Sequence, residues 1–406
     1  MRRAVLAGLA ALAAAAALTG CGSTASTRIT SNSLTVYTSL PLRGERAAQS
    51  LAILRGEKLA LQESGGRIGG LKVGLVALND ADPKTGTWEP GIAAANARQA
   101  ARNPTTIAYV GESDSGGTAV SLPITNETGV LQVSPLSSLT GLTRESDKGE
   151  PDKYYPSARR TFARLVPDGA TEARALVEWL GDEEVKTIAV ATDGRQEGLG
   201  MLLDLRNALR GTAIQLLEVV RVEPDAKSFE GPVRDLTQKV TPNAVVYLGS
   251  APETAGLLLR AVHAAAPLLP LYATGGVAFP GFAKALGGAG RVVGLTSPIV
   301  APDASLAAVK RFESSYRGAF GVAPPAEAAY GYEAMRSVLQ AVRDAGSEGN
   351  DRSAIIDAFM APKRANTVLG DYSIDRFGDT STHAIGAYSV TGGHIRYDRT
   401  LDGGSG

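Results

Sequence analysis

Few residues of this chain have both the type and the spacing that catalysis requires. Gly111-Glu-Ser-Asp-Ser115 resembles the G-x-S-x-G turn of serine hydrolases, but a serine occupies the position of the second glycine. The three histidines, His263, His383 and His394, are scattered and none lies near that turn in sequence. The base beside a serine nucleophile is most often a histidine, so a hydrolase is disfavoured and would be supported only by turnover that Ser115→Ala abolishes.

The sequence also lacks the short motifs of metal, nucleotide and redox sites. It contains no H-E-x-x-H, no C-x-x-C and no G-x-x-x-x-G-K-[ST]. The glycines of Gly288–Gly294 precede an expected strand, whereas a dinucleotide-binding turn follows one. We therefore expect no enzyme activity, no cofactor and no metal site.

Serines and glycines follow two expected strands, where they are placed to bind a ligand. Ser115-Gly116-Gly-Thr118 follows the strand Thr106–Val110 and opens a helix, and Ser137 and Ser138 follow the strand Val130–Val133. In open α/β sheets, ligands bind beyond the carboxyl ends of the strands, where helix N-termini offer free amides to an anion. Serine also caps helices very often, and these residues taken alone favour capping.

Short apolar runs alternate with longer amphipathic stretches from Leu34 onward, which predicts an α/β fold with parallel sheets. The series restarts after Pro167, so we expect two doubly wound lobes. The segment Lys148–Arg164, with two prolines and a charge cluster, is expected to cross between them. The expected strands of the two runs are 34–38, 71–78, 106–110 and 130–133, then 187–191, 214–222, 244–248 and 269–272.

The last part of the chain has too few expected strands to form the hydrophobic core of a third domain. We expect a strand at 292–297, helices at 305–320, 326–345 and 353–360, and closing antiparallel strands at 370–375 and 384–390. These elements are expected to return to the two lobes.

The N-terminus has the order of features of an exported protein. Met1-Arg2-Arg3 precedes the apolar run Ala4–Leu18, which is shorter than the roughly 20 residues that span a bilayer. Leu18-Thr-Gly-Cys21 resembles the bacterial lipobox, which predicts a signal peptide over residues 1–20 and a lipid on Cys21. Residues 21–33 would form a flexible tether to the outer face of the cell membrane. A free or buried thiol is the alternative.

Composition excludes several classes of protein. The chain has 406 residues with 41 basic and 41 acidic side chains, so it has no global charge to attract nucleic acid. Its single cysteine cannot form a disulfide within the chain.

In the order and spacing of its motifs, the sequence resembles the periplasmic Leu/Ile/Val-binding proteins of ABC importers over nearly the whole mature chain. The residues that carry this resemblance are Leu40-Pro-Leu42, Gly65-Gly-Arg-Ile-Gly-Gly70, Asn79-Asp-Ala-Asp-Pro83, Tyr109–Gly116, Gly129–Ser138, Ile188–Asp193, Val245–Gly249 and Ala329–Ala334.

The resemblance implies a type I periplasmic-binding-protein fold with two lobes joined by three crossing segments. By position, these lie near Arg164–Pro167, Ser297–Val300 and Asn366–Gly370. Lobe 1 would then comprise 34–164 and 298–367, and lobe 2 would comprise 165–297 and 368–402. The resemblance also assigns Ser115, Gly116, Ser137 and Ser138 to the ligand's carboxylate and amino group.

The second lobe departs from the family pattern. Gly194–Gly198 stands where the family places an aromatic residue, and the acidic residue that binds the ligand's amine aligns with Thr274-Gly-Gly276. Desolvating an unpaired ammonium is costly, so leucine is expected to bind poorly. Either Glu197 replaces the missing charge, which favours an amine or amide ligand, or it is a solvated loop carboxylate. Thr274 is kept as a ligand-binding candidate. Tyr330 is interpreted as a core residue, and the alternative is that it reaches the hinge side of the cleft.

The predicted function is therefore capture of an amino acid or related small polar solute by hinge closure. The partners would be that solute and an ABC permease, and the protein would act as a monomer without nucleic acid. The alternative is a sensor of the same fold that signals to a membrane partner.

Overall fold

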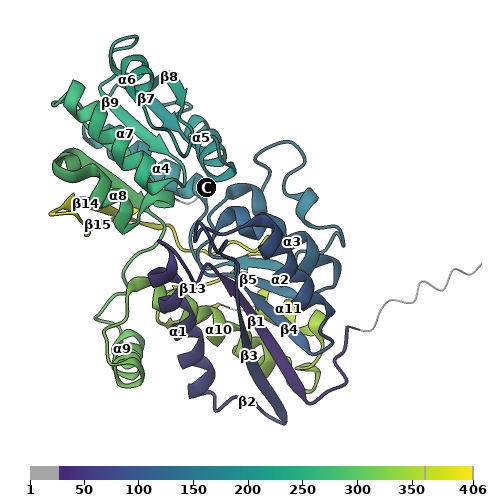
Figure 1. The fold of residues 1–406 in the computed structure, drawn as a ribbon. Coiled ribbons are helices and arrows are strands. Elements are labelled where there is room, and N and C mark those ends of the chain that lie inside the picture. Colours follow the sequence, from purple (N-terminus) through teal and green to yellow (C-terminus); the bar gives the residue numbers. More distant parts are fainter. Residues whose placement is uncertain (1–26, 361–362, 405–406) are drawn as a thin grey trace, which may run out of the picture.

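Two β-sheets, each flanked by helices, form the two halves of the protein (Figure 1). The structure, a computed structural model, describes residues 27–360 and 363–404. Cys21 and the predicted signal peptide lie outside the described residues. Among the described residues, no helix is both long and apolar enough to cross a membrane.

The first sheet has six strands in the order β2-β3-β1-β4-β5-β6. All neighbours are parallel except the short β2, which is antiparallel to β3. Both faces are covered by helices, which explains why all five residues of the central β4 are buried. The strands are β1 (Ser33–Leu40), β2 (Arg67–Ile68), β3 (Leu71–Asn79), β4 (Thr106–Val110), β5 (Leu131–Ser134) and β6 (Phe162–Arg164).

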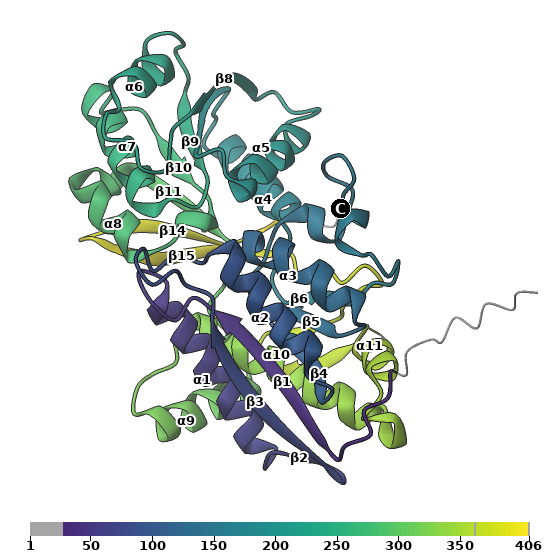
Figure 2. The same cartoon turned by 45° about the vertical axis from the view of Figure 1, so that its right-hand side comes forward.

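The second sheet has seven strands in the order β15-β14-β11-β10-β9-β7-β8. Its first five strands along the chain are parallel, while β14 pairs antiparallel with β11 and β15 pairs antiparallel with β14. The strands are β7 (Thr187–Thr192), β8 (Gln215–Arg221), β9 (Ala244–Leu248), β10 (Leu271–Ala273), β11 (Val293–Ser297), β14 (Ala384–Thr391) and β15 (His394–Asp402). In Figure 2, β14 and β15 run along the boundary with the other half.

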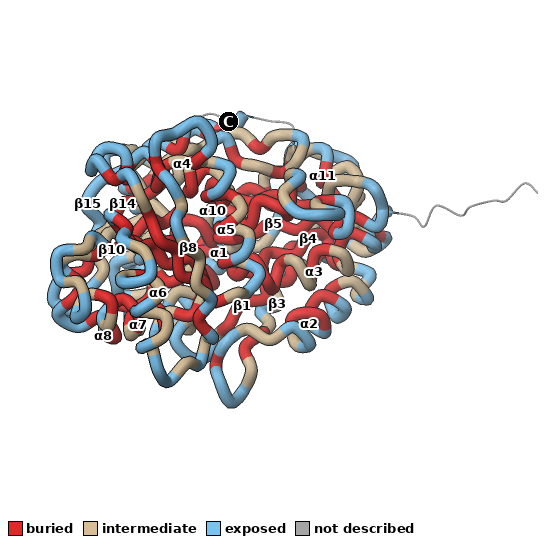
Figure 3. The backbone as a smooth tube through the Cα atoms, turned by 90° about the horizontal axis from the view of Figure 1, so that it is seen from above, coloured by how far each residue is buried: buried red, intermediate tan, exposed pale blue. Residues whose placement is uncertain are grey.

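The helices enclose the central strands from both sides, and the tube in Figure 3 is buried at strands such as β4 and β5 and exposed at the outer turns. A separate hairpin is formed by β12 (Arg364–Thr367) and β13 (Gly370–Tyr372). The longer helices are α1 (Ala47–Glu63), α2 (Pro90–Arg102), α3 (Ser115–Glu127), α4 (Gly169–Asp182), α5 (Gln196–Ala208), α6 (Glu230–Thr237), α7 (Pro252–Ala265), α8 (Pro280–Leu286), α9 (Ala307–Phe320), α10 (Ala326–Asp344) and α11 (Arg352–Met360).

Helices α10 and α11, from the last part of the chain, pack against the first sheet. Glycines at the contact between α1 and α10 allow these two helices to approach closely. A Cβ atom on Gly56 of α1 would lie 2.1 Å from the carbonyl oxygen of Ala328, and one on Gly331 of α10 would lie 2.2 Å from that of Ile53. No larger residue fits at either position without moving a helix. The buried apolar residues of α10 and α11 therefore share one core with β1, β4 and β5.

The prediction that Lys148–Arg164 crosses between the two lobes is wrong. Phe162–Arg164 forms β6, which pairs in parallel with β5 as the sixth strand of the first sheet. The chain leaves this sheet only after Arg164 and enters α4 at Gly169. A strand of three residues flanked by prolines and charges has no apolar periodicity that sequence reasoning can detect.

The second crossing is anchored by hydrogen bonds with two tyrosines. The Tyr330 hydroxyl accepts a hydrogen bond from the amide of Val300 at 3.0 Å, and the Tyr388 hydroxyl donates to the carbonyl of Ile299. The second crossing is thus held by α10 on one side and by β14 on the other. The third crossing follows Ile374, which still packs in the core of the first sheet, and ends where β14 begins at Ala384. It therefore lies later than the expected Asn366–Gly370.

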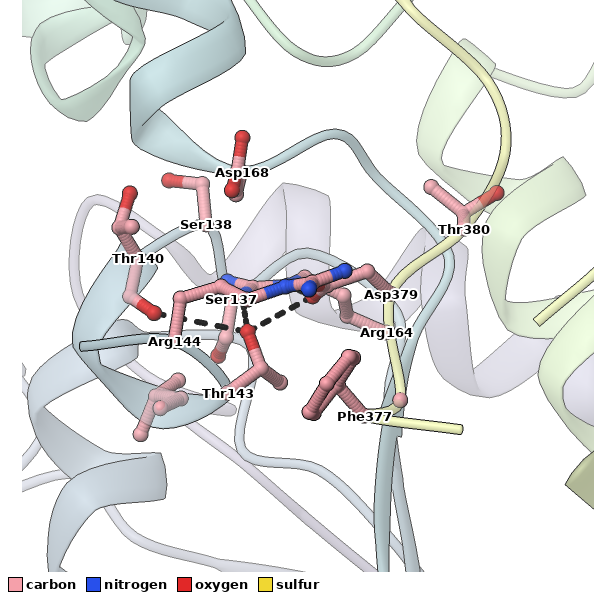
Figure 4. A network of polar contacts seen from close by, with 12 residues as sticks. Ser137, Ser138, Thr140, Thr143, Arg144, Arg164, Asp168, Phe377, Asp379 and Thr380 are labelled. Atoms are coloured by element: carbon pink, nitrogen blue, oxygen red, sulfur yellow. Dashed lines mark hydrogen bonds and ion pairs between the residues drawn. The ribbon is translucent and has the colours of Figure 1, made fainter. Parts of the chain in front are cut away.

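A buried guanidinium joins the first and third crossings (Figure 4). The side chain of Arg164 is fully buried and donates to Asp379 at 2.8 Å, to the carbonyl of Leu139 at 2.7 Å and to the Thr143 hydroxyl. The other carboxylate oxygen of Asp379 accepts from Arg144 at 2.7 Å. Arg164 and hydrogen bonds from Arg144 and Thr143 outweigh burial and keep the pKa of Asp379 below its usual value.

We predict that Asp379→Asn lowers the free energy of unfolding by about 3–5 kcal/mol, because the substitution leaves the buried charge of Arg164 without its counter-ion. Urea unfolding measures this change. Asp357→Asn is the matched control, since Asp357 also pairs with an arginine but its side chain is 74% exposed. The control should cost at most about 1 kcal/mol. Equal effects of the two substitutions would contradict the structural role of Asp379.

Candidate functional site

A small cavity lies between the two sheets, at the carboxyl ends of their strands. Its volume of about 40 Å³ has room for a few water molecules. The first sheet and its loops contribute Arg46, Gln49, Ser113, Asp114, Ser115, Leu136 and Ser138, the second contributes Glu197, Gly275, Gly276 and Phe279, and the second crossing contributes Ser297, Pro298 and Ile299. We call this cavity the cleft.

The two halves touch each other on both sides of the cleft. A carboxylate oxygen of Glu45, just before α1, accepts from the amide of Gly281 in α8 at 2.8 Å. On the other side, the Thr140 hydroxyl donates to Asp204 of α5 at 2.8 Å. These contacts tie the two halves of the protein together beside the cleft.

Two of the predicted site residues, Ser115 and Ser138, are brought together in the cleft. The Ser115 hydroxyl lies in the first turn of α3 and accepts from the amides of Ser138 and Leu139 at 3.1 and 3.2 Å. The helix starts at Ser115, which places the hydroxyl at its N-terminus. With both acceptor positions used by amides, the Ser115 proton is free to be donated.

Gly116 and Ser137 do not line the cleft, although both were expected there. Ser137 is fully buried and its hydroxyl contacts the Thr118 hydroxyl at 2.7 Å and the Glu112 carbonyl at 3.2 Å. A Cβ atom on Gly116 would lie 2.4 Å from the ring of Trp88. Both residues support the loops that carry Ser115 and Ser138.

The loop after β10 has no room for a side chain at Gly275 or Gly276. A Cβ atom on Gly275 would lie 2.7 Å from Cδ of Pro298, and one on Gly276 would lie 2.8 Å from Oε1 of Glu197. Thr274 is buried beside this loop and is not part of the cleft lining. The carboxylate of Glu197, at the start of α5, thus occupies space next to the position at which the acidic residue was expected.

Burial and neighbouring acids raise the pKa of Glu197 to about 8. Desolvation is the main cause, the carboxylates of Asp114, Asp193 and Glu172 add to it, and Arg46 opposes it. Burial also raises the pKa of Asp114, against the attraction of Arg46 and Arg195. Glu197 is therefore a carboxyl of the cleft and not a solvated loop residue.

Sequence reasoning did not identify Arg46, Asp114 or Phe279 as site residues. Arg46 pairs with Asp114 at 3.0 Å, and its guanidinium lies 4.2 Å from the centre of the Phe279 ring across the cleft. The positions of Arg46 and Asp114 after buried strands were an available indication. Phe279 follows the buried strand β10 at the same distance as Arg46 follows β1, so the same indication was available for it. Within residues 27–360 and 363–404, no three histidine, cysteine or acidic side chains are grouped to hold a metal ion.

Comparisons with known proteins agree with this architecture. A family model described as periplasmic binding protein matches residues 36–394. The Leu/Ile/Val-binding protein homolog 1 of Brucella abortus (strain 2308) is 28% identical over 350 residues, which cover 84% of this chain and 85% of the relative.

Solved structures show the same fold. A leucine binding protein from Thermotoga maritima has a TM-score of 0.77 at 22% identity and covers 91% of this chain and 99% of its own. A solute binding protein from R. palustris in complex with benzoate has a TM-score of 0.72 at 18% identity, with 91% and 96% covered. The predicted fold, two α/β lobes of the type I periplasmic binding proteins, is confirmed.

We predict that Gly275→Ala lowers the free energy of unfolding by about 1–3 kcal/mol, because the added methyl group overlaps Pro298 in the second crossing. Gly318→Ala in α9 is the control, since a Cβ atom there meets nothing within 4 Å. In a helix this control should be neutral or stabilising by up to about 1 kcal/mol. Chemical unfolding compares the two variants, and an unaffected Gly275→Ala would show that the crossing is not packed against this loop.

Proposed function

Because the chain belongs to the periplasmic binding protein family, we propose that it captures an amino acid or a related small polar solute between its lobes and delivers it to an ABC permease. The protein is an extracytoplasmic solute-binding protein and not an enzyme. The observation that carries the proposal is the cleft, which is lined from both lobes at the carboxyl ends of their strands. This is where open α/β sheets bind ligands.

Capture would proceed by rotation of the lobes about the three crossings. Lobe 1 would comprise residues 34–164 and 298–374, longer than expected because Tyr372 and Ile374 pack in its core, and lobe 2 the remainder up to 402. The contacts of Glu45 with Gly281 and of Thr140 with Asp204 would form on closing. A solute that binds both lobes stabilises the closed form and so shifts a pre-existing equilibrium towards it.

The relatives support import as the role. One solved structure is described as a putative branched-chain amino acid ABC transporter from Rhodospirillum rubrum, and another is a branched-chain amino acid transporter protein from Streptococcus pneumoniae in complex with isoleucine. We place the solute's anionic or carbonyl group, where it has one, at the N-terminus of α3 beside Ser115 and Ser138. Both residues line the cleft and are largely buried.

A thermal-shift screen with amino acids, amides, polyamines and aromatic acids tests the proposal. A ligand at about 100 times its Kd stabilises the protein by about 2.7 kcal/mol. We predict that Ser138→Ala weakens binding of the best compound by about tenfold or more and changes the Tm of the empty protein by no more than about 2 °C. The exposed Ser228→Ala is the control. Undiminished affinity in Ser138→Ala would remove this residue from the site, and a screen without any stabilising compound would contradict the proposed function.

We further propose that Cys21 is lipidated and anchors the mature protein to the outer face of the membrane. The support is the order of basic start, apolar run and small residues before the cysteine. Cys21→Ser should abolish both lipid attachment and cleavage. Mass spectrometry of the membrane fraction then finds a diacylglycerol-modified Cys21 at the N-terminus only in the wild type. An unmodified N-terminus in the wild type would contradict the anchor.

A further inference from the structure

From Thr27 onward, the chain is bound to the loop that precedes α11. The Thr27 hydroxyl donates to Asp351 at 2.9 Å, and the Thr27 carbonyl accepts from the amide of Arg352 at 3.1 Å. The amide of Ile29 donates to the carbonyl of Asn350 at 2.8 Å, and the Asn350 side chain donates back to the carbonyl of Ile29 at 2.7 Å. Ile29 itself is buried in the core of lobe 1. These contacts fix the start of the described chain to lobe 1.

This attachment lies at the edge of the first sheet that is opposite the cleft. The guanidinium of Arg352 donates to the carbonyl of Thr106, the first residue of β4, at 2.8 Å. In the same loop, a Cβ atom on Gly349 would lie 3.2 Å from the side chain of Leu71, the first residue of β3. The parallel strands of this sheet start here and end at the cleft. In Figure 2, α11 and β2 lie at the lower end of the molecule, and α6 and β8 of lobe 2 lie at the upper end.

We call this edge the anchor edge. It comprises residues 27–33, 63–72, 102–106, 127–131 and 344–352, which are the starts of the strands of the first sheet and the segments that precede them. The eight residues of β1 separate it from the cleft by about 23 Å.

The length of chain between Cys21 and Thr27 limits how far the protein can be from a lipid on Cys21. Six residue steps separate the two residues, fewer than in the expected tether of residues 21–33, because Thr27 and Ile29 are already bound to lobe 1. Six residues span at most about 20 Å, even when they are fully extended. This is less than the depth of the sheet along β1, so the chain cannot reach around lobe 1 to its cleft side.

We propose that the anchor edge is the surface of the protein that faces the lipid bilayer, with lobe 1 between the membrane and the cleft and with lobe 2 beyond the cleft. This inference rests on the lipid that is proposed above for Cys21. The anchor then restrains lobe 1 alone. Lobe 2 is therefore the lobe that changes its distance from the membrane when the hinge closes.

The charges of the anchor edge do not favour an anionic membrane, because its exposed basic and acidic side chains are equal in number. A surface rich in lysine and arginine would be drawn to anionic lipids, whereas a balanced one is not. We therefore expect the short chain after Cys21 to set the orientation. The exposed basic residues are Arg28, Arg67, Lys72 and Arg102, and the exposed acidic residues are Glu63, Glu127, Asp344 and Glu348.

Energy transfer from a labelled protein to labelled lipid measures this orientation. Cys21 is the only cysteine of the chain and its sulfur would carry the lipid, so a second cysteine can be labelled selectively. Lys72→Cys places a fluorophore on the anchor edge. Leu268→Cys places one just before β10, at the far end of lobe 2, where Leu268 is 96% exposed. The full mature lipoprotein is reconstituted into phosphatidylcholine vesicles that contain a rhodamine-labelled lipid as the acceptor.

We expect the transfer from position 72 to exceed that from position 268 by about twofold or more, because the tether keeps the anchor edge within about 20 Å of the lipid on Cys21. An insertion of about 20 Gly and Ser residues between Ser26 and Thr27 adds roughly 25 Å of mean reach and should bring the two values together. Vesicles that contain phosphatidylglycerol should give the same difference as phosphatidylcholine alone.

Equal transfer from the two positions, or stronger transfer from position 268, would overturn the inference. A difference that survives the insertion, or that appears only with phosphatidylglycerol, would also overturn it, because the tether would then not be the cause. Mass spectrometry of the same sample distinguishes this failure from failure of the anchor. If Cys21 carries diacylglycerol, only the orientation is wrong, whereas an unmodified Cys21 removes both. Solute capture is tested separately by the thermal-shift screen.

Discussion

The buried guanidinium of Arg164 is the interaction on which the arrangement of the two lobes depends. Removing a charged side chain from water is tolerated only if its donors are satisfied, and here the partners come from two separate segments, the loop with Leu139 and Thr143 and the loop with Asp379. Asp379 brings the third crossing to the end of β6, and the carbonyl of Leu139 brings the loop that follows β5. That loop carries Ser138, so one ion pair positions both a crossing and one wall of the cleft.

The second crossing connects closure to the site in a different way. Val300 and Ile299 are held by tyrosines from opposite lobes, and the next residue towards β11, Pro298, packs against Gly275. The loop after β10 can approach the crossing this closely because Gly275 has no side chain. The amide of Gly275 is in turn fixed by Glu172 of α4. Gly275, which lines the cleft, is therefore coupled both to the second crossing and to lobe 2.

Sequence reasoning predicted the fold well where burial imposes a pattern and failed where it does not. Strands such as β4 and β9, buried along their whole length, appear as apolar runs between helices. The strand β15 was missed because most of its residues are exposed, and β6 was missed because it has only three residues. At the site, Ser115 and Ser138 could be placed from their positions after strands. The orientation of Ser137 could not, since it depends on how a tight loop turns its neighbouring side chains.

Glu197 illustrates why a site cannot be transferred position by position from a family pattern. The sequence position aligned with the family's acidic residue is a glycine, and packing against Pro298 leaves no room there for any side chain. Yet the space beside Gly276 holds the carboxylate of Glu197, which arrives from the first turn of α5 and not from the loop after β10. A negative charge can thus be kept at nearly the same point while the element that supplies it changes. The direction of approach and the burial change with it, because Glu197 faces Asp114 across the cleft and both carboxyl groups have raised pKa values. Two such groups repel each other when ionised, and burial adds to the cost of charging either one. The relocated acid therefore keeps a negative group near the expected position and adds an electrostatic interaction with a carboxyl group of the first sheet's half.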